Sequence, residues 1–376
     1  MQHWSLTWRA RDHAFEGDAA CADADFALYF AGREAAGSHS IFNSLRRLCP
    51  HALIMGCSTG TVIDGEELHD DEAVAVAVRL DRATVALARV AVTGQSSFED
   101  GRALATQLRK PGLVGVLVLS DGLNVNGTAL VAGLQDILGA DIPIGGGMAG
   151  DGSAFARTLV CADAPPAERI VAALGFYGDG LTIRLGAAHG WNYFGPTRRI
   201  TRSDGAVLHE MDGKPALDLY ERYLGEEAAD LPASALLYPL LVTNPDAPED
   251  EVVRTVLAVD REHRTMTFAG DIPQGWSARL MRGAFDSLAA GAAQAAAEAS
   301  GAPGEGGLAL LISCVGRRLL MGQRAEDEVE AVAGVLSARF RQIGFYSYGE
   351  IATQGVAGWC GLHNQTMTIM TLQEAA

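Results

Sequence analysis

Short apolar runs alternate along the chain with polar stretches of helical periodicity, and one arrangement of them occurs three times. Each occurrence predicts a strand, a helix and a second strand. In that order the segments are Asp25–Phe30, Ser40–Leu48 and Ala52–Met55; then Gly115–Leu119, Thr128–Leu138 and Ile142–Ile144; then Leu308–Ser313, Glu326–Phe340 and a strand that starts at Ile343. Strand–helix–strand units are common, but three similar ones in one chain indicate an internal repeat.

Small residues follow the second strand of every unit, in the segments Gly56–Gly60 (GCSTG), Gly145–Gly152 (GGGMAGDG) and Gly344–Glu350 (GFYSYGE). Glycine is needed where a chain turns sharply or where its backbone comes close to another backbone or a ligand. We therefore predict a glycine-containing turn in each unit, which either packs at a tight corner between sheets or lines a ligand. Further strands are predicted after these turns, at Ala73–Leu80, Thr84–Val92, Arg157–Cys161, Ile170–Tyr177 and Thr366–Leu372.

A region of different character separates the second and third units. It predicts a helix at Gly213–Leu224, strands at Leu236–Val242, Glu251–Val259, Thr265–Ala269 and Arg279–Arg282, and an alanine-rich helix at Gly283–Ala299, with Asn244–Asp250 as a solvated loop and Ser300–Gly307 as a linker. The predicted fold class is α/β or α+β. Two domains, with a boundary near Asp212, share repeated β-α-β-β units whose mixed sheets are covered by helices.

Composition excludes several classes of protein. The 376 residues are 48% hydrophobic, and 46 Asp and Glu outnumber 29 Lys and Arg, for a formal charge of −17. Such a chain repels nucleic acid and anionic lipid surfaces, so neither is an expected partner. We find no signal peptide and no apolar run long enough to span a membrane. Six scattered cysteines without a C-x-x-C pair argue against disulfides and zinc, so we expect a cytoplasmic protein with reduced thiols.

Several motifs, in order along the chain, resemble the FIST family of sensory proteins. They are GCSTG at Gly56–Gly60, GGGMAGD at Gly145–Asp151, DGKPALDLY at Asp212–Tyr220, Ser313-Cys314 followed by Arg317, GFYSYGEIA at Gly344–Ala352 and HNQTMTIM at His363–Met370. The resemblance implies a FIST N-like domain over residues 20–212 and a FIST C-like domain over residues 213–376. It further implies a sensor without catalytic chemistry. Such a sensor binds a small ligand, for which amino acids have been proposed, and reports to a signalling partner.

The segment His189–Pro196 resembles one bacterial branch of the family, which is described as haem-binding nitric-oxide sensors that regulate histidine kinases or cyclic-di-GMP enzymes. Haem iron needs an axial ligand in an apolar pocket with aromatic walls. On this reading His189 is the metal ligand, and Trp191, Tyr193 and Phe194 flank the haem. The alternative is that His189 is a loop histidine packed on its own aromatic neighbours.

Strand ends and the family motifs supply the other candidate ligand-binding residues: Cys57, Gly146, Gly147, Cys314, Arg317, Tyr346, Tyr348, Glu350, His363 and Asn364. The polar cluster around His363 suits an amino-acid ligand better than haem iron. Glu350 suits a ligand amine or a structural arginine such as Arg317. A cysteine nucleophile at Cys57 or Cys314, with His363 or His51 as base, is the enzymatic alternative, but free cysteines are more often inert packing residues.

Overall fold

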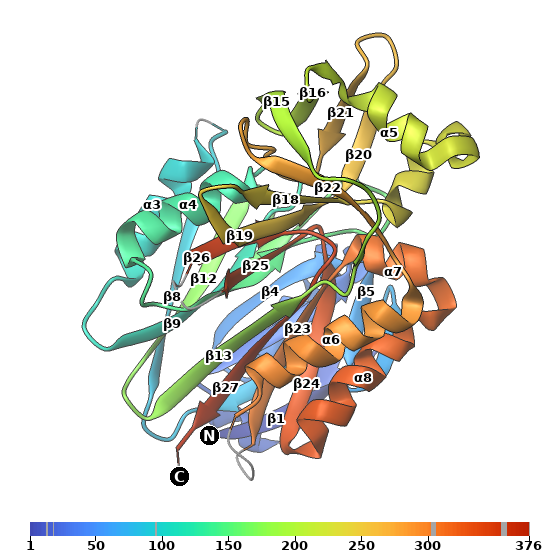
Figure 1. Cartoon of the computed structure of the whole chain (residues 1–376). Coiled ribbons are helices and arrows are strands. Elements are labelled where there is room, and N and C mark those ends of the chain that lie inside the picture. The colour runs from blue at the N-terminus through green and yellow to red at the C-terminus, as the bar shows by residue number, and fades with distance from the viewer. Residues whose placement is uncertain (13, 18, 95, 302–305, 355–358, 376) are drawn as a thin grey trace.

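We describe a computed structural model of the chain, which places all residues except 13, 18, 95, 302–305, 355–358 and 376. Among the described residues, three six-stranded sheets surround a shared interior, and a nine-stranded sheet forms a separate region at one end (Figure 1). No helix among the described residues is long and apolar enough to cross a membrane. The mixed α/β class predicted from the sequence is confirmed.

Each six-stranded sheet contains one parallel pair of strands, and the connection between the two strands is helical. The pairs are β3 (Phe26–Gly32) with β4 (Leu53–Thr59), β9 (Leu113–Ser120) with β10 (Ile144–Met148), and β23 (Gly307–Cys314) with β24 (Phe340–Ser347). The connections carry α1 (Arg33–Gly37) and α2 (Ser40–Leu48), α4 (Gly127–Leu138), and α7 (Val315–Met321) and α8 (Glu326–Leu336). These are the three predicted units, so the repeat is confirmed.

Two antiparallel strands extend each pair on the same side. A return strand lies beside the first parallel strand, and a lead strand lies beyond it. In the order return and lead, these are β7 (Ala73–Arg79) and β1 (Gln2–Arg9), β12 (Ile170–Tyr177) and β8 (Thr84–Ala91), and β27 (Met367–Glu374) and β13 (Leu181–Ala188). The helix α3 (Ser97–Leu108) connects β8 to β9, and the short β2 (Ala14–Glu16) pairs with β1.

A fifth strand in each sheet comes from a neighbouring unit. From the first unit, β5 (Thr61–Asp64) pairs with β24 of the third. From the second, β11 (Val160–Ala162) pairs with β4 of the first, and from the third, β25 (Gly349–Gln354) pairs with β10 of the second. The hairpin partners β6 (Glu67–Asp70) and β26 (Trp359–His363) extend two of these exchanges. The exchange is therefore cyclic. The domain boundary between residues 212 and 213 stays a prediction, because strands on both sides of it share sheets.

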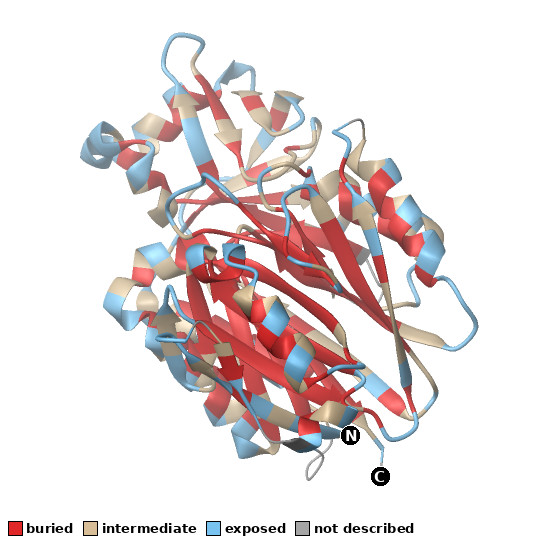
Figure 2. Cartoon of the chain, turned by 180° about the vertical axis from the view of Figure 1, so that it is seen from behind, coloured by how far each residue is buried: buried red, intermediate tan, exposed pale blue. Residues whose placement is uncertain are grey.

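Alternation along the strands explains why both faces of the sheets are buried (Figure 2). In β3, Phe26, Leu28 and Phe30 point into the shared interior, whereas Ala27 and Tyr29 belong to the outer core under α2. Residues of the other two sheets, such as Leu117 and Leu310, meet the first set in the same interior. The sheets thus form one body with helices on its outside.

One glycine occupies the equivalent place in all three second parallel strands. Gly56, Gly146 and Gly344 lie opposite Tyr29, Val118 and Leu311 in register. A Cβ atom at each glycine would stand 2.4, 1.9 and 1.9 Å from the carbonyl oxygen of that partner. The prediction that these glycines form turns is wrong, because they lie inside buried strands. The structure does show a close approach between two backbones at each glycine, which we had predicted as one reason for glycine at these positions.

The separate region is an insert within the third unit, between β13 and β23. It contains β14 (Asn192–Tyr193), β15 (Arg198–Asp204), β16 (Val207–Met211), β17 (Lys214–Pro215), α5 (Ala216–Leu224), β18 (Leu240–Asn244), β19 (Ala247–Arg254), β20 (Val256–Asp260), β21 (Thr265–Phe268) and β22 (Ser277–Arg282), and α6 (Phe285–Ala299) returns the chain to the body. The predicted loop at Asn244–Asp250 is instead mostly the β18–β19 hairpin, and the predicted strand Glu251–Val259 is two strands. Part of the predicted linker lies outside the described residues.

Candidate functional site

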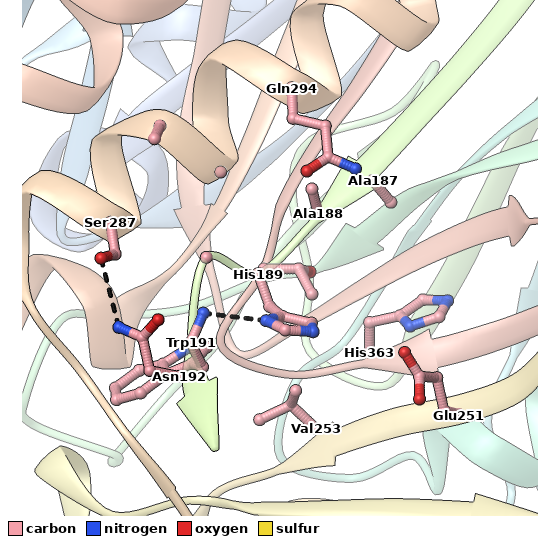
Figure 3. A pocket seen from close by; sticks show the side chains of 14 residues that line it. Ala187, Ala188, His189, Trp191, Asn192, Glu251, Val253, Ser287, Gln294 and His363 are labelled. Atoms are coloured by element: carbon pink, nitrogen blue, oxygen red, sulfur yellow. Dashed lines mark hydrogen bonds between the residues drawn. The ribbon is translucent and has the colours of Figure 1, made fainter. Parts of the chain in front are cut away.

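A cavity of about 450 Å³ lies at the joint between the insert and the three-unit body (Figure 3). Four segments line it: the end of β13 with the loop after it, strand β19 of the insert, helix α6, and the turn between β26 and β27. The lining residues are Ala187, Ala188, His189, Gly190, Trp191, Asn192, Glu251, Val253, Ser287, Ala290, Gly291, Gln294, His363 and Thr366. Polar groups from distant parts of the sequence therefore converge on one small space, as in ligand sites at domain interfaces.

Small residues let α6 pack closely against the loop that carries His189. Gly190 adopts φ +69°, and a Cβ there would lie 2.2 Å from the carbonyl oxygen of Ser287. On the helix, a Cβ at Gly291 would lie 2.6 Å from the backbone nitrogen of Gly190. The alanine-rich composition of α6 thus has a packing reason. This contact fixes one wall of the cavity.

His189 presents a neutral imidazole to the cavity. Its Nδ1 atom accepts a hydrogen bond of 2.9 Å from the backbone N–H of Trp191, which leaves the ring proton on Nε2. Burial, together with the nearby Arg317 guanidinium, lowers the pKa of His189 to about 4. Near neutral pH this side chain therefore offers an N–H donor rather than a positive charge.

His363 lines the same cavity from the end of β26. Its side chain is buried, its Nε2 atom lies 3.4 Å from the carbonyl oxygen of Ala352, and burial beside Arg254 lowers its pKa to about 4. In Figure 3 the rings of His189 and His363 and the carboxylate of Glu251 face the same space. Two neutral imidazoles and one carboxylate therefore dominate the chemistry of the cavity.

A buried ion pair supports the cavity from behind. Arg317 is fully buried and pairs with Glu328 at 2.7 Å. Its guanidinium also donates to the carbonyl oxygens of His189 at 2.7 Å, Leu288 at 2.9 Å and Gln365 at 3.3 Å. Arg317 thus ties the His189 loop, α6 and the β26–β27 turn together, and it does not line the cavity.

Two other predicted residues belong to this supporting framework. Tyr346 donates a hydrogen bond of 2.6 Å to Glu328. The buried carboxylate of Glu350 accepts hydrogen bonds from the Ser347 hydroxyl at 2.6 Å and the Thr366 hydroxyl at 3.0 Å, and burial raises its pKa to about 8. Since Thr366 lines the cavity, Glu350 holds part of its wall. Its hydrogen-bonding partners are two hydroxyls and the backbone N–H of Thr366, at 3.3 Å, rather than Arg317.

The remaining predicted residues lie elsewhere or are enclosed. Cys57, Gly146 and Gly147 are buried within strands of the three-unit body, and Cys314 is buried at the end of β23. Burial raises the pKa of both the Cys57 and the Cys314 thiol, which disfavours a reactive thiolate at either. Asn364 is buried beside His363, and among the described residues neither polar atom of its amide has a hydrogen-bond partner. Tyr348 lines a smaller, mostly apolar cavity. Roles of these residues in binding stay predictions.

The aromatic residues predicted around a haem do not surround His189. Tyr193 is 59% and Phe194 38% exposed, and they lie beside Arg279 and Arg282 outside the cavity. Trp191 is buried and donates its indole N–H to the carbonyl oxygen of Gln365 at 3.0 Å. A histidine that binds iron through Nε2 donates its Nδ1 proton, whereas Nδ1 of His189 accepts. In this arrangement the residues do not fit a haem.

Sequence reasoning found His189, Trp191 and His363 but missed the other walls of the cavity. Glu251 and Val253 come from β19, and Ser287 and Gln294 come from α6. Only the run of small residues in α6 gave a sequence signal of close packing. Nothing in the sequence around Glu251 indicated that the insert would bring a carboxylate to His363.

Comparisons with known proteins agree with the motifs. Residues 25–214 match the FIST N domain and residues 216–353 match the FIST C domain, so the chain belongs to the FIST family. FIST domains are associated with small-ligand sensing in signalling proteins and are generally non-enzymatic. A search of curated proteins finds no match.

A search of solved structures matches this chain to a cyanuric acid hydrolase from A. caulinodans. The two chains share 13% sequence identity, and the match covers 78% of this chain and 99% of that chain. Its TM-score of 0.19 is too low to carry an argument about fold or activity.

Proposed function

We propose that this protein is a sensor that binds a small polar ligand in the joint cavity and passes its bound state to a signalling partner. The observation that carries the proposal is that the cavity walls come from both parts of the molecule. Glu251 and Val253 belong to the insert, whereas His363 and Thr366 belong to the body. A ligand that contacts both walls favours one arrangement of insert and body over others, which is what a sensor requires.

The loop after His189 links the cavity to the surface. Asn192 donates a hydrogen bond of 3.2 Å to the Ser287 hydroxyl on α6, and the next residue, Tyr193, is exposed on the edge of the insert sheet. Displacement of Asn192 by a ligand would therefore move a surface segment. A histidine kinase or a cyclic-di-GMP enzyme remains the proposed recipient of this change.

A blocked cavity tests the proposal. Ala290 lines the cavity, whereas Ala297, on the same helix, is exposed and does not. Wild type, Ala290→Phe and the matched control Ala297→Phe are compared by thermal shift against amino acids, amines, carboxylates and hemin. We expect at least one compound to raise Tm by roughly 2–4 °C or more in wild type and in the control, but not in Ala290→Phe. If no compound shifts Tm, or if Ala290→Phe keeps the shift, the proposal is wrong.

Titration with hemin tests separately whether the ligand of the sensor is haem. Stoichiometric uptake, a Soret band that moves on addition of nitric oxide and its loss in His189→Ala would establish haem as the ligand. They would also show that the Trp191 N–H bond to His189 breaks on loading. Failure to take up hemin leaves the metabolite sensor, which the neutral imidazoles and the polar cavity favour.

A further inference from the structure

The charged groups around the joint cavity are strongly asymmetric. Its lining includes the carboxylate of Glu251 but no lysine or arginine. Neither imidazole supplies a positive charge near neutral pH, because burial lowers the pKa of both His189 and His363 to about 4. The lining itself therefore carries the formal charge of one carboxylate, and the two nearby guanidiniums, Arg254 and Arg317, lie outside the lining.

Glu251 has no partner for its charge among the described residues. Its side chain is half-buried, burial raises its pKa, and it makes no hydrogen bond or ion pair within this part of the chain. Partial burial removes some of the hydration of this carboxylate, and a ligand that supplies a cation or a donor would offset that loss. This unpaired carboxylate points to the chemistry of the ligand.

The arginines closest to the cavity are committed elsewhere. Arg254 lies three residues after Glu251 in the same strand, and alternation sends it to the opposite face, where it donates to the carbonyl oxygens of Asp271 at 3.0 Å and Leu362 at 2.7 Å. Arg317 is held by Glu328. Neither guanidinium is available to bind an anionic ligand in the cavity.

The other lining groups define the remainder of the ligand. His189 offers its Nε2 proton as a donor. Gln294 donates its own N–H to Glu298 at 3.0 Å, which leaves its carbonyl oxygen as an acceptor. Val253, Ala188 and Ala290 provide short apolar walls between these groups. A matching molecule has a positive end, a short carbon chain and a hydrogen-bond acceptor.

We propose that the joint cavity selects a small organic ammonium ion, whose positive group binds the Glu251 carboxylate and whose acceptor binds the Nε2 proton of His189. This inference rests on the proposed function, since it names the ligand class of the same cavity. A carboxylate ligand would meet the charge of Glu251, and the lining contains no cation that could pair with it. For a zwitterion, the ammonium group would strengthen binding next to Glu251 and the carboxylate would weaken it.

A set of four-carbon probes that differ in charge tests this selection. They are 4-amino-1-butanol, 1,4-diaminobutane, 4-aminobutanoate and succinate, each titrated into the whole protein by calorimetry. We expect 4-amino-1-butanol to bind at least about tenfold more tightly than 4-aminobutanoate, and succinate not to bind. 1,4-Diaminobutane should bind more weakly than 4-amino-1-butanol, because its second ammonium group cannot accept the His189 proton. In Glu251→Gln the affinity for 4-amino-1-butanol should fall about tenfold or more. Glu262→Gln, an exposed glutamate of the insert, is the matched control and should bind like wild type.

The outcomes separate this inference from the function on which it rests. Tighter binding of succinate or 4-aminobutanoate, lost in Ala290→Phe, would overturn the cation selection and leave a sensor of another ligand class. Unchanged ammonium binding in a folded Glu251→Gln variant would also overturn it. If no probe binds and the wider thermal-shift set also gives no ligand, both proposals fail. Thermal unfolding of each variant confirms that the fold is intact before affinities are compared.

Discussion

The third unit of the body differs from the first two in one connection, and the candidate site lies there. In the first unit β1 ends at Arg9 and β3 begins at Phe26; in the second β8 ends at Ala91 and β9 begins at Leu113. In the third, the same connection runs from Ala188 to Gly307 and contains the whole insert. The repeat supplies a frame whose sheets are buried on both faces, and the polar cavity arises where that repeat is interrupted.

The two regions also differ in how tightly they are packed. Central strands of the body, such as β3 and β23, are buried at every position, whereas β20 of the insert exposes Leu257 to 48%. Local stability follows the density of buried contacts, so the insert should respond to a ligand more readily than the body.

The largest effect is expected from filling the close contact between parallel strands. In Gly146→Val the new Cβ would lie 1.9 Å from the Val118 carbonyl oxygen, and Gly146 has φ +151°. Neither strand has room to move, so we expect loss of soluble, folded protein, measured by yield and circular dichroism. Gly334→Ala is the control, because this exposed helix position has no atom within 4 Å of the added Cβ. It should be neutral or stabilise by about 0.5–1 kcal/mol. A well-folded Gly146→Val protein would contradict the contact.

A smaller but still large effect is expected from the buried ion pair behind the cavity. Arg317→Met leaves the Glu328 carboxylate without its cation and three carbonyl oxygens without a donor. We expect a loss of roughly 3–5 kcal/mol in the free energy of unfolding, measured by urea denaturation. Arg318→Met on the same helix removes a more exposed pair with Asp70 and should cost about 1 kcal/mol or less. Equal losses in the two variants would show that Arg317 has no special place in the framework.

The smallest expected effect is a change in pH dependence. The folded pKa of Glu350 is raised to about 8, so between pH 4.5 and 8 the folded state binds more protons and stability falls as pH rises. His189 and His363 act in the opposite direction, because their pKa values near 4 make stability fall as pH drops below 6.5. Between pH 6.5 and 8, wild type should lose up to about 1.4 kcal/mol per pH unit relative to Glu350→Gln. Parallel stability curves for the two proteins would exclude this assignment.

The sequence predicted the units but not their exchange. Apolar runs such as Leu308–Ser313 are long enough to mark buried strands, and the glycines marked the second strands. The exchanged strands β5 and β11 are short, and nothing in their composition selects a partner sheet, because pairing is decided by the packing of the whole body. We predicted that the glycines form turns because a sequence does not show where the backbones of two buried strands come close together.

The candidate site was predictable only where a local pattern existed. His189 and His363 stood out through their neighbours in the sequence, and the structure brings both to one cavity. Closeness in sequence did not place Tyr193 and Phe194 in that cavity, because they follow His189 into an extended segment on the edge of the insert. Glu251 became a candidate only once the insert was folded onto the body.

The cyclic exchange also constrains how the protein can be made. Strand β5 finds its partner β24 only after more than 270 further residues have been synthesised, and β10 must wait for β25. At roughly 5–20 residues per second, a nascent chain holds such unpaired, apolar strand edges for some tens of seconds. Protection of those edges by a chaperone during synthesis would then decide the yield of folded protein in the cell.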